Sequence, residues 1–203
     1  MNLADPWRET WTRLALAPPA TAFDQVLAAY REPHRVYHTL QHLEECFQRV
    51  REFPGSAEQP GEVLAALWYH DAVYDPHASD NEDRSGNLAG AVLLEAGAAV
   101  AAVTRVRSLI LATRHDTSPG PGDAALVVDI DLAILGADAS RFDQYEHQVR
   151  EEYSWAPDPI FAATRRRILT GFLRRAGIYT TAPFRSRFEA AARTNLERAL
   201  ARL

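Results

Sequence analysis

Histidine and carboxylate side chains occur in this sequence at spacings that suit a metal ion. His38 and His42 are four residues apart, which predicts that both lie on one face of a helix. His70 and Asp71 are adjacent inside the otherwise apolar segment 62–74, which predicts a buried helix. An unpaired carboxylate is costly in such surroundings, so we expect a cation or a dense hydrogen-bond network beside Asp71.

Further candidates lie later in the chain. Asp129 and Asp131 stand in an apolar stretch, and His115-Asp116 repeats the His-Asp pair at the end of a predicted helix. Imidazole and carboxylate ligands drawn from several helices suit Mn, Fe, Ni, Co, Zn or Mg rather than a thiolate-bound structural zinc. Cys46, on the helix that carries His42, is interpreted as a small buried hydrophobe. A core histidine that only hydrogen-bonds its aspartate is the alternative interpretation.

Short motifs follow one another in order between residues 32 and 153. They are Glu32-Pro33-His34-Arg35, Tyr37-His38 with His42, Trp68-Tyr69-His70-Asp71-Ala72-Val73-Tyr74-Asp75-Pro76, Asp80-Asn81-Glu82, Arg84-Ser85, Asp129-Ile130-Asp131-Leu132 with Ile134-Leu135-Gly136, and Val149-Arg150 with Glu152-Tyr153. This order resembles the HD superfamily of metal-dependent phosphohydrolases. It is most similar to a bacterial subfamily of about this length whose members are described only as predicted HD phosphohydrolases.

The resemblance implies roles for individual residues. The implied metal ligands are His42, His70, Asp71 and Asp131, around one divalent ion or two. His38 would donate a proton to the leaving oxygen, although His38 and His42 exchange roles if the first histidine of the pair is the ligand. Asp131 is preferred over Asp129 because the residues that follow it resemble the end of the family motif.

The activity that the resemblance implies is hydrolysis of a small phosphate ester, such as a nucleotide, by attack of a metal-bound water. Asp75 or Glu82 would orient this water. The candidates for holding the substrate are Arg35, Arg84, Arg114 and His115, because a guanidinium pairs with phosphate in bidentate fashion; His115 is also a candidate ligand for a second metal ion. Two other functions stay open: an HD-fold di-iron oxygenase, and a non-catalytic nucleotide-binding module that regulates a partner.

The elements that must position these residues are predicted to be helices, because helical spacing dominates and strand patterns are nearly absent. We expect nine or ten helices, over 6–16, 23–30, 37–53, 62–74, 79–95, 101–115, 124–135, 141–153, 159–176 and 186–203. Two of them would open with capping boxes, at Ser79–Glu82 and at Ser186–Glu189. Together they predict one all-α domain over 1–203, a multi-helix bundle of the HD type with its metal-site core at about 33–153 and flanking helices at both termini.

Composition limits the kinds of partner. The chain has 203 residues and a net charge of -5, with 22 basic residues that are all arginine, which argues against a nucleic-acid polymer as ligand. The single cysteine fits a reducing cytoplasm. The N-terminus has no apolar signal segment, and the apolar run 96–103 is too short to cross a membrane. These observations predict a cytoplasmic protein with a small phosphorylated substrate, whereas the oligomeric state stays open.

Overall fold

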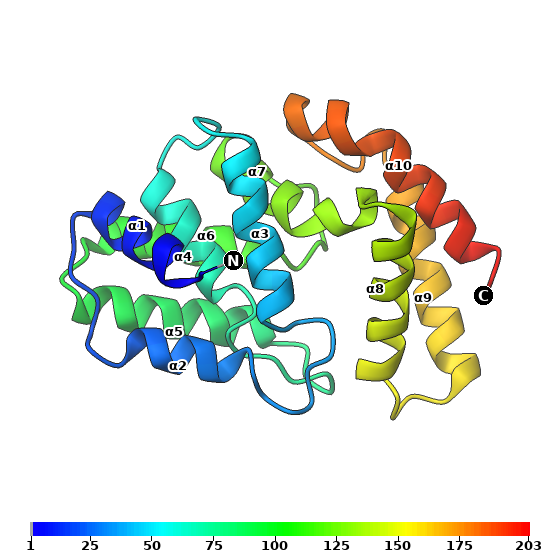
Figure 1. The fold of residues 1–203 in the computed structure, drawn as a ribbon, viewed down its shortest axis with the longest axis horizontal. Helices are drawn as coiled ribbons and strands as arrows, with labels where there is room; N and C mark the ends of the chain where they lie inside the picture. Colours follow the sequence, from blue (N-terminus) through cyan, green and yellow to red (C-terminus); the bar gives the residue numbers. More distant parts are fainter. Residues whose placement is uncertain (1) are drawn as a thin grey trace. The chain divides into compact units, whose positions relative to one another are not determined.

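The chain folds into helices alone over the residues that the structure describes. This computed structural model describes residues 2–203, in which ten α-helices and one 3₁₀ helix are present and no strand occurs (Figure 1). The prediction of an all-α fold is therefore confirmed, and so is the helical interpretation of the ambiguous segment 124–135, which forms α7 and the 3₁₀ helix η1.

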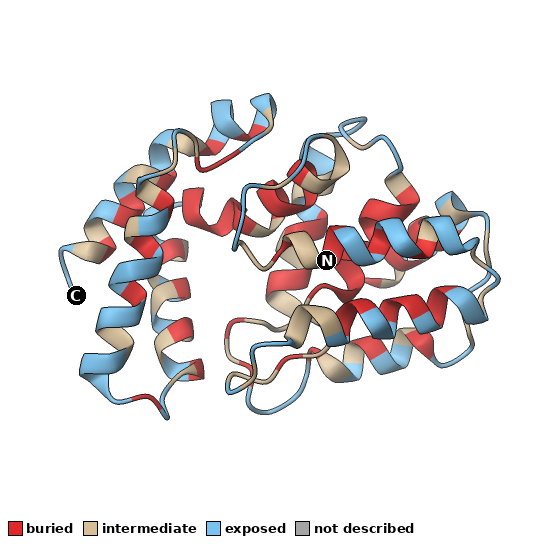
Figure 2. Ribbon diagram, turned by 180° about the vertical axis from the view of Figure 1, so that it is seen from behind, coloured by how far each residue is buried: buried red, intermediate tan, exposed pale blue. Residues whose placement is uncertain are grey.

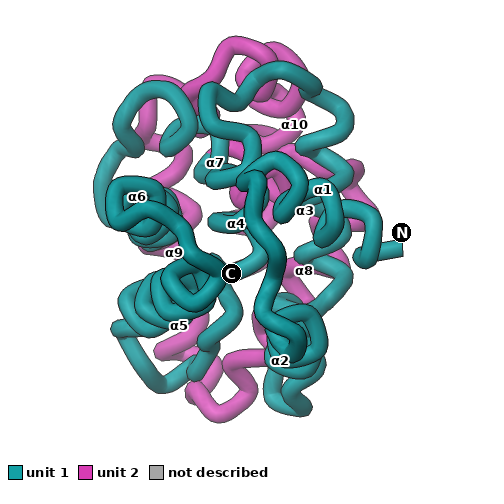
Figure 3. Tube along the Cα trace, turned by 90° about the vertical axis from the view of Figure 1, so that its left-hand side faces the viewer, with its two compact units in different colours: residues 1–128 teal, residues 129–203 magenta. Residues whose placement is uncertain are grey.

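The helices fall into two compact units, residues 1–128 and 129–203 (Figure 3). The first unit contains α1 Ala4–Leu14, α2 Ala22–Ala29, α3 Leu40–Glu52, α4 Pro60–Tyr69, α5 Asn81–Glu95, α6 Val100–Ala112 and the beginning of α7 Asp123–Asp131. The second unit contains the end of α7, η1 Leu132–Gly136, α8 Ala139–Glu152, α9 Asp158–Leu173 and α10 Ala182–Leu200.

Helix α4 is the centre of the first unit. Every residue of α4 after Pro60 is buried, whereas α5 and α10 each expose one side (Figure 2). Helices α1, α3, α5 and α6 all pack against α4. Gly61 allows the close approach of α1, since a Cβ there would lie 2.9 Å from the backbone nitrogen of Leu14. At the other end, the Trp68 indole donates to the hydroxyl of Thr10 at 3.0 Å, so the end of α4 that precedes His70 is firmly held.

The second unit has a separate aromatic core, made where α10 packs on η1. Phe184 and Phe188 of α10 are buried against Tyr179, whose hydroxyl donates to the carbonyl of Leu132 at 3.0 Å. In a chain without lysine, arginines carry the internal ion pairs, as Arg165 does with Glu146. A guanidinium suits this task because its planar fork binds both oxygens of a carboxylate.

Two predicted helix boundaries that bear on the site are wrong. Helix α3 begins at Leu40, because Thr39 is its N-cap and accepts a hydrogen bond from the backbone N–H of Gln41 at 3.3 Å. His38 therefore precedes the helix and does not share a helical face with His42. Helix α4 ends at Tyr69, so His70 is its C-cap and Asp71 lies in the turn that follows.

Both predicted capping boxes are also wrong. Helix α5 begins at Asn81, and its N-cap Asp80 makes no side-chain cap hydrogen bond. Helix α10 begins at Ala182, four residues before Ser186, and the Glu189 carboxylate instead accepts from the backbone N–H of Ile178 at 3.0 Å. The first Ser-x-x-Glu pattern begins two residues ahead of α5 and the second lies inside α10, so neither serine is an N-cap. None of the helices between residues 2 and 203 is long and apolar enough to span a membrane.

Candidate metal centre

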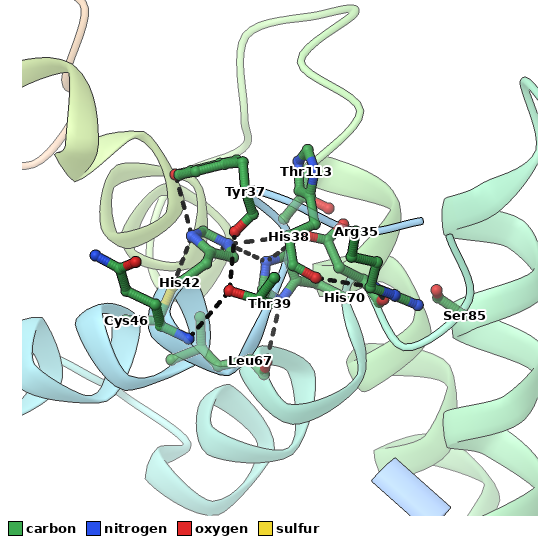
Figure 4. A network of polar contacts seen from close by, with 12 residues as sticks. Arg35, Tyr37, His38, Thr39, His42, Cys46, Leu67, His70, Ser85 and Thr113 are labelled. Carbon is green, nitrogen blue, oxygen red and sulfur yellow. Dashed lines mark hydrogen bonds and ion pairs between the residues drawn. The ribbon is translucent and has the colours of Figure 1, made fainter. Parts of the chain in front are cut away.

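Two histidines meet where the start of α3 approaches the end of α4. His42 is on the first turn of α3 and His70 is the C-cap of α4, and both are buried. Their Nε2 atoms are 3.0 Å apart (Figure 4). The carboxylate of Asp71 joins them, with Oδ2 3.1 Å from Nε2 of His70 and 3.6 Å from Nε2 of His42. Three of the four predicted metal ligands are thus brought together.

The hydrogen bond of His70 to the end of α4 fixes which of its nitrogens carries a proton. Nδ1 of His70 lies 2.9 Å from the carbonyl oxygen of Leu67, and a carbonyl can only accept. Nδ1 therefore donates, and in the neutral imidazole Nε2 is left with its lone pair. That lone pair faces the Asp71 oxygen, which is also an acceptor. Two acceptors 3.1 Å apart are favourable neighbours only when a proton or a metal ion lies between them.

Tyr37 orients the second imidazole. Its hydroxyl lies 3.1 Å from Nδ1 of His42, and both side chains are buried. When Nδ1 donates to this hydroxyl, Nε2 of His42 presents its lone pair to the same point as His70 and Asp71. An outer partner on the remaining ring nitrogen is the usual companion of a metal-binding histidine. Sequence reasoning missed this role of Tyr37, although its place one residue before His38 was noticed.

The thiol of Cys46 is also close to the two histidines. One nitrogen from each of His42 and His70 and the sulfur of Cys46 all lie within 4.8 Å of one another, and such a buried group can hold a metal ion. Sequence reasoning had set Cys46 aside, although its spacing of four residues from His42 equals the spacing between His38 and His42. The spacing that pointed to the histidines therefore also pointed to the cysteine.

Opposing effects act on the Asp71 carboxyl. Burial acts to raise its pKa, but the positive charges that His70, His38 and His42 carry when protonated together outweigh this and hold the pKa well below its usual range. The Asp71 side chain is therefore a carboxylate at neutral pH. A permanent negative charge beside two imidazole lone pairs is the electrostatic environment that a divalent cation requires.

His38, the predicted proton donor, lies beside this group. Its ring stacks on the ring of Tyr74, with 4.3 Å between their centroids, and its centroid is 6.0 Å from that of His42. The charge of His38 also acts on the Asp71 carboxyl. His38 is thus close to the donor atoms of the site but is held by an aromatic neighbour.

The predicted substrate-binding arginines of the first unit are engaged with other groups. Arg35 is buried and hydrogen-bonds only to groups of the protein, which leaves none of its donors for a phosphate. Arg114 forms ion pairs with Glu82 and Asp83. Arg84 is exposed and lies 3.9 Å from the carboxylate of Asp80. Phosphate binding by Arg84 or Arg114 stays a prediction.

The remaining candidates of this unit sit in turns. The Asp75 carboxylate accepts from the backbone N–H of His77 at 2.9 Å, and the Asn81 amide holds the Asp75 backbone. His115 lies three residues beyond the end of α6 and has a left-handed backbone, φ 60°. Water orientation by Asp75 or Glu82, and the place of His115 at the substrate, stay predictions.

Asp129 and Asp131 belong to the second unit. The carboxylate of Asp129 is fully buried and accepts from the backbone N–H groups of Thr180 and Thr181, at 2.8 and 2.7 Å, and from the Thr181 hydroxyl. Asp129 thus secures the start of α10. Asp131 is half-buried at the end of α7, and its part as a metal ligand stays a prediction.

No family model, no curated protein and no solved structure matches this chain. The functional argument therefore rests on the chemistry of the residues themselves.

Proposed function

We propose that this protein is a metal-dependent phosphohydrolase that acts on a small phosphate ester. One observation carries the metal centre: Nε2 of His42, Nε2 of His70 and Oδ2 of Asp71 converge with 3.0, 3.1 and 3.6 Å between them. Two ligands about 2.1 Å from one ion are about 3.0 Å apart at a right angle and about 3.4 Å apart at the tetrahedral angle. The three separations lie close to these values.

The third ligand is better assigned to Asp71 than to Cys46. The Cys46 sulfur is 3.8 Å from Nε2 and 4.0 Å from Nδ1 of His42, so it lies beside or over the ring. An ion on the lone pair of Nε2 would be more than about 3.5 Å from that sulfur, against a zinc–sulfur bond of about 2.3 Å. Cys46 would therefore have to move to bind the ion. Asp71 would not, because its Oδ2 already lies 3.1 Å from Nε2 of His70 and 3.6 Å from Nε2 of His42.

The chemistry assigned to the bound metal is general for divalent ions: it lowers the pKa of a water ligand and polarises a phosphoryl oxygen. The protein supplies the rest. His42 and His70 provide neutral nitrogen donors whose orientation Tyr37 and the Leu67 carbonyl fix. His38 is assigned the proton that goes to the leaving oxygen, because its imidazole lies beside the donor set, with its ring centre 6.0 Å from that of His42, and is not itself one of the three donors.

The proposal is tested by metal content and hydrolysis together. The protein is stripped with a chelator and reloaded separately with Mn, Fe, Ni, Co, Zn or Mg, and each form is assayed on a panel of phosphate monoesters and diesters. We expect at least one ion bound per chain and turnover with at least one of the metals. His70→Ala should reduce both metal content and turnover to background, whereas the control His147→Ala, at an exposed histidine of α8, should change neither. Full metal content in His70→Ala would contradict the assigned site.

One observation favours a second candidate, oxygen chemistry on iron. Two histidines and one carboxylate with open positions are the ligand set of non-haem iron oxygenases. The test is anaerobic loading with Fe²⁺ followed by addition of oxygen. Oxygen consumption by the iron form, with no hydrolysis of any phosphate ester under any metal, would favour the oxygenase and overturn the phosphohydrolase.

A further inference from the structure

Arg35 is a charged side chain inside the core of the first unit. It lies in the loop between α2 and α3, and its side chain is 0% exposed. The guanidinium carbon is 5.3 Å from the ring centre of Tyr30 and 5.3 Å from that of Tyr74. Arginine is almost never buried without partners, so this position calls for an account of its hydrogen bonds.

All five N–H donors of this guanidinium are used. Nε and Nη2 donate to one carboxylate oxygen of Glu32, at 3.0 and 2.9 Å. Nη2 also donates to the carbonyl of Ala72 at 3.2 Å, and Nη1 donates to the carbonyls of Asp71 at 2.6 Å and of His38 at 3.3 Å. A guanidinium has five donors in a rigid plane, and here each of them has an acceptor.

These acceptors come from two separate segments. The carbonyls of Asp71 and Ala72 belong to the turn after α4, and that turn begins with His70. The carbonyl of His38 belongs to the loop just before α3, which carries His42. The guanidinium therefore joins the backbone that presents one imidazole to the backbone that presents the other.

We propose that Arg35 is a positioning residue for the metal centre, which sets the spacing between His42 and the His70–Asp71 pair and thereby the affinity for the ion. The inference rests on the proposed metal site and assigns to Arg35 a different role from the phosphate contact that the sequence suggested. Arg35 acts through the carbonyls and touches neither the ion nor the substrate. Its contribution resembles that of outer partners of metal ligands, whose loss costs about 10- to 100-fold in affinity.

Lysine cannot replace this arginine. An ammonium keeps the charge but has three donors at one point, so it cannot reach Glu32 and the carbonyls of His38 and Asp71 together. The variant Arg35→Lys should therefore weaken Co²⁺ binding at least about 10-fold. The visible spectrum of the bound Co²⁺ should also change, because the angles between its ligands are no longer the same.

Arg165 offers a matched control in the second unit. It is also buried, pairs with the carboxylate of Glu146 and lies 5.0 Å from the ring centre of Tyr145. Arg165→Lys should lower the melting temperature as Arg35→Lys does, but should leave the Co²⁺ affinity and spectrum unchanged. If Arg35 contributed to stability alone, both variants would lower the melting temperature and neither would change the Co²⁺ affinity or spectrum.

The experiment measures Co²⁺ affinity by competition with a chromogenic chelator, at a temperature where circular dichroism shows each variant folded. Glu32→Gln is the second variant if Arg35→Lys does not fold, because it weakens the hold on the guanidinium and leaves the carbonyl contacts in place. It should lower the Co²⁺ affinity about 3-fold, since one charged partner among four acceptors is neutralised. If Arg35→Lys shows the affinity and spectrum of the wild type, the role of Arg35 is overturned but the metal site is not. The same holds for Glu32→Gln where that variant is used. Absence of metal from the wild type would overturn the proposed function as well.

Discussion

The two units each contain a carboxylate in apolar surroundings, and the two carboxylates are stabilised in different ways. Asp129 accepts three hydrogen bonds from neutral donors of Thr180 and Thr181, and burial raises its pKa above the ordinary value despite them. Asp71 faces the imidazoles of His42 and His70, and these histidines with His38 hold its pKa well below its usual range against the effect of burial. Neutral hydrogen-bond donors satisfy the carboxylate of Asp129, whereas the carboxylate of Asp71 depends on positive charge.

This difference separates a structural carboxylate from a candidate ligand. Neutral N–H and O–H groups satisfy the lone pairs of Asp129 without any added ion. The nearest partners of Asp71 are imidazole nitrogens, which stabilise its charge only when they carry a proton or share a metal ion with it. A buried acidic residue is therefore a strong metal-site candidate when acceptors, and not donors, converge on it.

The largest expected effect follows from changing Asp71. Asp71→Asn keeps the shape of the side chain but removes the charge, so Co²⁺ affinity should fall more than about 100-fold, beyond the loss of an outer partner. The measurement is a competition titration with a chelator. Asp129→Ala serves as the control and should bind Co²⁺ as the wild type does. Equal affinity of wild type and Asp71→Asn would show that both carboxylates are structural.

The converse prediction concerns stability. Asp129→Ala leaves the donors of Thr180 and Thr181 without their acceptor, so the free energy of unfolding should fall by about 2 to 3 kcal/mol. Urea unfolding of the metal-free protein measures this loss. In the same metal-free conditions Asp71→Asn leaves no neutral donor without its acceptor, so its loss comes from the missing charge beside the imidazoles and should fade as the pH falls below 3.8. A loss for Asp129→Ala that faded in acid, or one for Asp71→Asn that did not, would reverse the comparison.

A smaller effect is expected from Tyr37. Tyr37→Phe removes the hydroxyl beside Nδ1 of His42, and Co²⁺ affinity should fall about 10-fold because the imidazole loses its orienting partner. Tyr69→Phe is a close control: Tyr69 is buried in α4 next to His70, and its hydroxyl has no hydrogen-bond partner within the part of the chain that the structure describes. That control should leave the affinity unchanged and should not lower stability. A similar loss in both variants would argue against orientation by Tyr37.

Helical periodicity predicted most of the fold because it depends on apolar residues at local spacing. It placed the ends of α3 and α4 wrongly, because the polar residues at those ends are held by contacts that spacing does not encode. Thr39 caps α3, and the turn after α4 is held by Ser85, whose hydroxyl accepts from the backbone N–H of Val73 at 3.0 Å. The partner of Thr39 is two residues away and polar, and the partner of Val73 is twelve residues away, so neither contact shows in the spacing of the apolar residues.

The candidate site was also predictable only where local spacing in the sequence carries the signal. Adjacency in an apolar segment pointed to His70 and Asp71, and a spacing of four pointed to His42. The spacing gave no means of seeing that Arg35 would be enclosed by Tyr30 and Tyr74, rings that come together only through the tertiary fold. Arginine was expected at the phosphate from its chemistry alone, whereas its burial decides what it binds.

The smallest effect expected is a pH dependence that belongs to Asp129. Burial raises the pKa of Asp129 in the folded protein above its ordinary value of 3.8. A raised pKa means that the folded state favours the protonated form, so the stabilisation is complete below pH 3.8 and declines as the pH rises through the folded pKa. The difference in unfolding free energy between wild type and Asp129→Ala should therefore be largest in acid. It should shrink on the way to neutral pH, with a slope no steeper than about 1.4 kcal/mol per pH unit for one group.

Urea unfolding of both proteins at a series of pH values in a chelating buffer measures this slope, and the chelator removes any contribution of a bound ion. The carboxylate of Asp71 is present in both proteins, so its titration cancels in the difference. A difference that instead grew with pH would mean that the donors of Thr180 and Thr181 outweigh burial. Asp129 would then resemble Asp71 in favouring its charged form, and the contrast between the two units would rest on the kind of partner alone.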